Sequence, residues 1–253
     1  MVAKDLRQLA GACLVIVAVA SGFASWTLMA APPVKLTPVV ATIEDLTAEI
    51  QSLLTSIEEG LLSTESYRDR QQQMKRQAVQ IAIFSQALAD YEGEHSLKKT
   101  APDIRDAALA VAKAGSMKES AEQVAVIKQG LEGTTAGTAV RQFDWTRLAR
   151  SGAMMGAMKE RSEAIRRGLR RPKDPAAESR QPLAIALMAL VLHGDTHAVK
   201  DPSDKPAWQE ACLELQGHMS RAAAAIKSRD GSAVDHFRMG MEACDKCHQK
   251  FKP

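Results

Sequence analysis

Apolar residues recur at steps of three and four positions along most of the chain, the spacing of one buried face of an α-helix. Between residues 38 and 62 they fall at Val39, Ile43, Leu46, Ile50, Leu53, Leu54 and Ile57. No segment alternates with the period of two that β-strands need. Glycine and proline divide the pattern into segments that predict helices over residues 38–62, 64–91, 102–114, 117–131, 144–170, 175–193, 206–228 and 233–251. The sequence therefore predicts an all-α fold.

The two halves of the chain resemble each other. In AIFSQALADYEGEH, from Ala82, and AIALMALVLHGDTH, from Ala184, five of 14 positions agree. The next predicted helices agree where Pro102, Ala107 and Leu109 match Pro206, Ala211 and Leu213. An internal duplication predicts two tandem antiparallel four-helix bundles, over residues 36–138 and 139–253.

The N-terminal segment, residues 1–35, has the pattern of a membrane anchor followed by a linker. Lys4 and Arg7 precede an uncharged stretch over residues 9–31. A bilayer-spanning helix needs about 20 apolar residues, and a cleaved signal peptide has an apolar core of only about 7–15. The cations predict a cytoplasmic N-terminus, an anchor in the inner membrane and a periplasmic remainder. Cleavage after Ala30 or Ala31 is the alternative and would release a secreted protein.

Composition and charge exclude several classes of function. The net charge is +3 with 25% charged residues, which gives no reason to expect a nucleic-acid partner. We find no paired carboxylates, no nucleophile with a base and no phosphate-binding loop, so an enzyme is not expected.

The strongest run of basic residues consists of Arg166, Arg167, Arg170, Arg171 and Lys173. It predicts a solvated helix end, where cations are favourable beside the negative C-terminal pole of the helix. A docking patch for an acidic partner is the alternative.

The last predicted helix carries Cys244, Cys247 and His248 in the spacing C-x-x-C-H, close to the C-terminus. Two thiols at this spacing lie on one helix face and can add to the two vinyl groups of haem while the imidazole reaches the iron. A redox-active thiol pair would favour a helix N-terminus, where the thiol pKa is lowered, whereas this pair lies about three turns into the last predicted helix. A structural zinc site would need further ligands, and Cys212 is the only other cysteine beyond the N-terminal segment. The motif therefore predicts one covalently attached haem c.

The stretch ACDKCHQKF near the C-terminus resembles the class II c-type cytochromes, that is cytochrome c-prime and its six-coordinate relatives. The resemblance implies a four-helix bundle with haem on its last helix, and it covers about residues 140–253 and, more weakly, 36–138. The internal alignment places Glu132, Thr135 and Ala136 opposite the three motif residues, so the first bundle is expected to lack haem. Because members of the family often pair bundles through their early helices, a pseudo-dimer between the two bundles is expected.

The resemblance also implies roles for Arg150 and Met154, which match an arginine followed four residues later by the side chain on the open haem side. Arg150 is expected near a haem propionate, and Met154 is expected to face the iron as a candidate distal ligand. With Met154 bound, the haem would be six-coordinate and would exchange electrons with a redox partner protein. With Met154 only packed over the ring, the iron would be open to nitric oxide or carbon monoxide. Met155 and Met158 are further candidates nearby.

Overall fold

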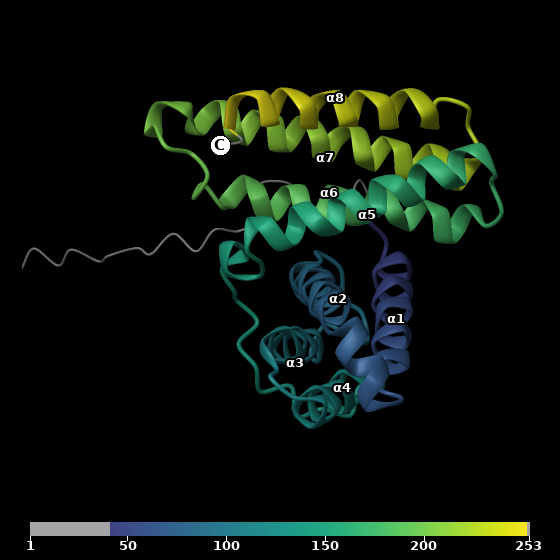
Figure 1. Cartoon of the computed structure of the whole chain (residues 1–253), viewed down its shortest axis with the longest axis vertical. Helices are drawn as coiled ribbons and strands as arrows, with labels where there is room; N and C mark the ends of the chain where they lie inside the picture. Colours follow the sequence, from purple (N-terminus) through teal and green to yellow (C-terminus); the bar gives the residue numbers. More distant parts are fainter. Residues whose placement is uncertain (1–40, 252–253) are drawn as a thin grey trace, which may run out of the picture.

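The computed structural model describes residues 41–251, which form α-helices and two short 3-10 helices without any β-strand (Figure 1). The all-α fold expected from the sequence is confirmed for this part of the chain. The predicted anchor over residues 9–31 and its alternative cleavage sites lie outside the described residues. Among residues 41–251, no helix combines the length and the apolar character that crossing a membrane requires.

The first four helices pack against one another in chain order. They are α1 (Ile43–Gly60), α2 (Thr64–Asp90), α3 (Ala101–Lys113) and α4 (Met117–Leu131). Three of them begin at a side-chain cap in which a hydroxyl oxygen accepts a backbone N–H of the first turn, at Thr42, Ser63 and Ser116. Such caps satisfy N–H groups that have no partner inside the helix, and so fix where each helix starts.

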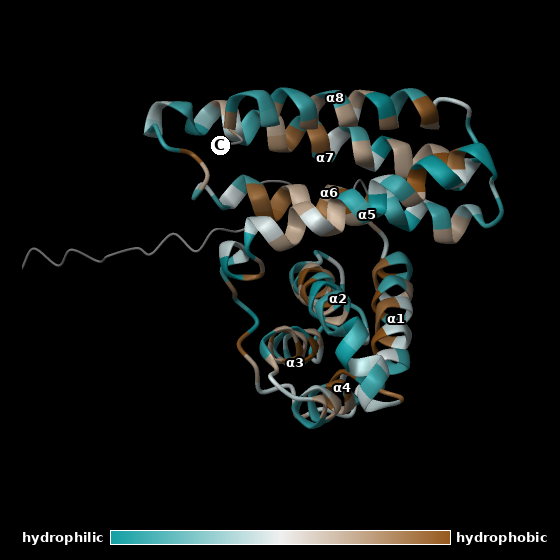
Figure 2. Cartoon of the chain, viewed as in Figure 1, coloured by the Kyte–Doolittle hydropathy of each residue, from teal (hydrophilic) through white to brown (hydrophobic). Residues whose placement is uncertain are grey.

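The last four helices form a second group, drawn from teal through green to yellow in Figure 1. They are α5 (Ser151–Arg170), α6 (Pro175–Gly194), α7 (Lys205–Ser228) and α8 (Ala233–Phe251). The closest packing is between α6 and α7 and between α7 and α8. Figure 2 shows hydrophobic residues concentrated where helices face one another. Burial of these faces is the main source of stability for helices of this length.

The predicted helix over residues 144–170 is wrong at its start. The structure has a 3-10 turn, η1 (Trp145–Arg147), and α5 begins only at Ser151. The Asp144 carboxylate accepts hydrogen bonds from both the backbone N–H and the hydroxyl of Thr146, which closes the short turn. Arg150 is extended, with ψ at 142°, so the helical hydrogen bonds cannot continue through it. The predicted helix over residues 38–62 also begins too early, since α1 starts at Ile43 after the cap at Thr42, and its residues 38–40 lie outside the described residues. The limits of the remaining predicted helices agree with the structure to within one or two residues.

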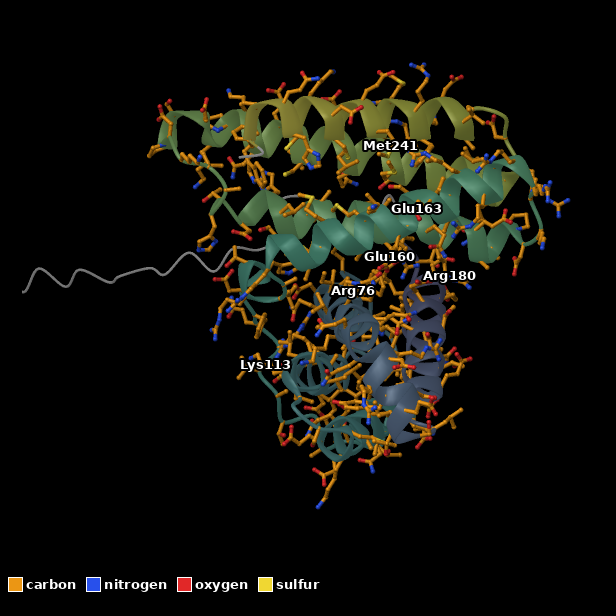
Figure 3. The ribbon with its side chains drawn as sticks, viewed as in Figure 1. Arg76, Lys113, Glu160, Glu163, Arg180 and Met241 are labelled. Atoms are coloured by element: carbon orange, nitrogen blue, oxygen red, sulfur yellow. The ribbon has the colours of Figure 1, made fainter. Side chains whose placement is uncertain are left out.

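One continuous hydrophobic core joins the two groups of helices, because α2 packs against α5 and α6. Polar contacts also cross this boundary. Arg76 of α2 pairs with Glu160 of α5 at 2.8 Å, and both side chains are visible in Figure 3. The indole N–H of Trp145 donates to the Asp90 carboxylate at 2.8 Å. The two groups are therefore packed together rather than joined only by the connecting segment.

Candidate functional site

Helix α8 presents the motif to the protein interior along one side. Phe237 and Ala243 on this side are buried, and Cys244 and Cys247 are half-buried against the main core. Gly240 brings α8 close to α7, since an added Cβ would lie 2.5 Å from the terminal methyl of Met219. A glycine is suited to such close approach of two helices. The two thiols thus face the other helices of the second group.

The motif residues line a cavity of about 30 Å³ between the four helices of the second group. Cys244, Cys247 and His248 form its α8 side, and His248 is otherwise exposed to solvent. The remaining walls are mainly apolar and come from α5, α6 and α7, with the residues Met155, Met158, Leu192, Trp208, Ala211, Cys212 and Leu215. Packing therefore gathers residues from four helices around the motif.

Trp208 is the largest side chain of the cavity wall and is held at both ends. Its indole N–H donates to the carbonyl of Leu192 at 2.7 Å. Its ring meets Phe251 edge to face, with the centroids 5.3 Å apart, and only 3% of the residue is exposed. Aromatic pairs favour this geometry. The α7 wall of the cavity is consequently fixed by a hydrogen bond from α7 to α6 and by a ring contact from α7 to α8.

The environment of the two motif thiols is apolar. Burial raises the pKa of Cys244 to about 11, with smaller contributions from Cys247 and Asp245. Burial also raises the pKa of Cys247. A redox-active dithiol requires a thiol of lowered pKa, because the thiolate is the reactive species. The pKa values of Cys244 and Cys247 are raised instead, so these two thiols lack the property that a redox-active dithiol needs.

Cys212 lies next to the motif, although sequence spacing gave no sign of it. It is buried, lines the same cavity, and has a pKa raised by burial first and then by Cys247 and Cys244. The structure thus brings three thiols and one imidazole to one cavity. Within residues 41–251, however, no group of three or more histidine, cysteine or acidic side chains is arranged to hold a metal ion.

The two residues that the family resemblance adds lie in different surroundings. Arg150 is exposed at the N-cap of α5, and its side chain makes no capping hydrogen bond. Met154 is fully buried in the main core and is not among the residues that line the motif cavity. Met155 and Met158 do line it. These two are three residues apart and share a face of α5, whereas Met154 is turned by about 100° from Met155.

The donors around the cavity fit a covalently attached haem in their chemistry. Two thiols lie on one helix face, an imidazole is adjacent, and the walls are apolar. The volume does not fit haem in this conformation, since a cavity of about 30 Å³ has room for only a few water molecules. Haem binding would therefore require the walls of the cavity to separate.

Comparisons of the chain with models of protein families, with curated proteins and with solved structures find no match.

Proposed function

We propose that the protein is a membrane-anchored, periplasmic c-type cytochrome of class II that carries electrons through one covalently attached haem c. The observation that supports this most is the placement of Cys244 and Cys247 on one face of α8 against an apolar cavity, with His248 beside them. The two thiols would form the thioether bonds, and His248 would bind the iron. The haem supplies one-electron redox chemistry, and the apolar walls limit the access of water to it.

The proposal includes an architecture of two tandem four-helix bundles, with haem only in the second. Helices α1–α4 and α5–α8 each pack in chain order, which supports the division at residues 138 and 139. The packing of α2 on α5 and α6 supports the idea that the first bundle acts as a built-in partner, in a pseudo-dimer. The first bundle then contributes packing area rather than a cofactor.

Electron transfer is favoured over gas binding by the methionines on the wall opposite the motif. Met155 and Met158 reach the cavity from α5, and a thioether is a suitable second axial ligand that raises the reduction potential. The second candidate function is gas binding, in which a five-coordinate iron binds nitric oxide or carbon monoxide. This function would follow if neither the Met155 nor the Met158 thioether bonds to the iron. No catalytic role is part of the proposal.

The test is expression of the full chain in a host with a c-type haem attachment system. We expect the purified protein to gain the mass of one haem, to keep it on a denaturing gel, and to lose it in the Cys244→Ser/Cys247→Ser variant. The reduced spectrum should be low-spin and unchanged by carbon monoxide. A high-spin spectrum that carbon monoxide shifts would select gas binding. A polypeptide with no added mass would overturn both candidates.

A further inference from the structure

Four cations gather at the end of the second group that lies opposite the motif. They line an open groove of about 600 Å³ at the turn between α5 and α6, and they are Arg167, Arg170, Arg171 and Lys173. We call these four residues the basic end. All four are exposed, and none of them is in an ion pair within residues 41–251. Their positive charge is thus available to an external anion.

The acidic side chains beside the basic end are engaged by backbone amides. Asp174 caps α6 and accepts the N–H groups of Ala176 and Ala177, at 3.0 and 3.2 Å. Glu178 accepts the N–H of Lys173 at 2.8 Å. These carboxylates stabilise the turn and the start of α6. They leave the guanidinium and ammonium groups without a carboxylate partner.

An apolar pocket of about 270 Å³ adjoins the basic end. Ile165 and Leu169 of α5, Ile226 of α7 and Val234 of α8 contribute to its lining. Gly168 and Glu178 line both the pocket and the basic groove, which places the two side by side. Val234, in the first turn of α8, is 54% exposed, so the pocket has an apolar side chain at its opening. The combined surface is amphipathic, with cations around an opening to apolar space.

The apolar pocket beside the basic end lies near the first turn of α1. Lys227, which follows Ile226 of the pocket, forms an ion pair with Asp45 in the first turn of α1 at 2.7 Å. The predicted anchor ends at residue 31, so residues 32–41 connect it to this point. An extended chain of that length spans at most about 35 Å. The linker therefore limits how far the start of α1, and with it the neighbouring Lys227, can lie from the membrane surface from which the anchor would emerge.

We propose that the basic end docks on anionic phospholipid at this membrane surface. The guanidinium groups match the paired oxygens of lipid phosphates, and the apolar pocket accepts part of an acyl chain. An acidic protein would satisfy the charges but would not account for the adjoining pocket or for its position beside the start of α1. The inference depends on the predicted anchor and not on haem. About 21 Å of α7 separates Ile226 from Cys212, so docking would direct the motif end away from the lipid.

The test uses the full chain reconstituted in lipid nanodiscs, with amide hydrogen exchange of residues 164–181 and 226–236 as the measurement. One set of discs contains only zwitterionic phosphatidylcholine, and the other contains about one third anionic phosphatidylglycerol. We expect about tenfold slower exchange of both segments in the anionic discs. This protection should disappear in about 0.5 M salt, where charges are screened within a few ångströms. Equal exchange in the two kinds of disc would overturn the proposal.

The variant Arg167→Gln/Arg170→Gln/Arg171→Gln should lose the protection while its helices stay folded, since these side chains make no ion pair. A matched control removes three cations from the far end of the first group, as Arg68→Gln/Lys113→Gln/Lys118→Gln. The hydrogen bond between Tyr67 and Ser120 shows that the starts of α2 and α4 lie together at this end of the first group. Lys113, the last residue of α3, is labelled in Figure 3. The control should keep the protection. Slower exchange with soluble poly-glutamate but not with anionic lipid would assign the surface to an acidic protein and would also overturn the proposal.

Discussion

Glu49 of α1 and Arg161 of α5 form a buried ion pair, with Oε1 and Nη1 2.5 Å apart. The second carboxylate oxygen contacts Nε of Arg180 at 3.2 Å, and Arg161 also donates to the side-chain carbonyl of Gln80. Glu49 is only 3% exposed, so solvent and salt screen its charge weakly. One carboxylate of the first group thus holds two cations of the second group.

Glu49→Gln should destabilise the protein, because it leaves the buried Arg161 and the half-buried Arg180 without their anion. We expect the free energy of unfolding to fall by about 3 kcal/mol, as measured by urea denaturation. Glu59→Gln is the control, since Glu59 pairs with Arg70 at the surface and should change stability by less than about 1 kcal/mol. Equal effects of the two substitutions would mean that the buried pair does not couple the groups.

Substitution of the α5 methionines in the haem-loaded protein tests which of them is the second axial ligand of the haem iron. Met155 and Met158 line the motif cavity and Met154 does not, so we expect the Met155→Leu/Met158→Leu variant to become high-spin and to bind carbon monoxide. Met154→Leu should keep the low-spin spectrum of the reduced protein. The reverse result would support Met154, the residue that the family resemblance indicates.

Cys212→Ala separates covalent haem attachment from a zinc site. Haem attachment through thioether bonds needs the two α8 thiols at their fixed spacing, and Cys212 lies on another helix. We expect the variant to carry the mass of one haem and an almost unchanged spectrum. A zinc site made from the cavity thiols would instead lose metal, detectable by elemental analysis of the purified variant. Loss of the attached haem would show that Cys212 takes part in attachment.

His218 should make stability depend on pH. Burial lowers its pKa from the ordinary value of 6.5, the nearby Arg221 cation lowers it further, and Nδ1 lies 3.1 Å from an Arg221 nitrogen. The unfolded chain therefore takes up the proton first as pH falls, and stability present above about pH 6.5 is lost below it. In His218→Gln the decrease in unfolding free energy from about pH 7.5 to pH 5.5 should be smaller. Some decrease should remain, since burial also lowers the pKa of His193. Identical pH profiles would contradict this assignment.

Local sequence was sufficient to predict the helices and the motif position. The apolar steps that end at Ile57, the hydroxyl caps such as Ser116 and the proline at the start of α6 each act within one or two helical turns. The spacing of Cys244 and Cys247 fixes their common face of α8 in the same way. The prediction failed at Asp144, where two local patterns compete. The helical periodicity predicts a helix from residue 144, but the Asp144 side chain caps a short 3-10 turn, and α5 begins only at Ser151.

Sequence alone therefore determined the helical segments and the face of α8 that presents the motif, because hydrogen bonds and side-chain periodicity within a helix depend on near neighbours. Only the tertiary structure decided which residues surround that face, since packing between helices joins residues far apart in the chain. It brought Cys212, Trp208, Met155 and Met158 to the motif and left Met154 in the core. It also placed the apolar pocket that adjoins the basic end near the start of α1, which no local pattern encodes.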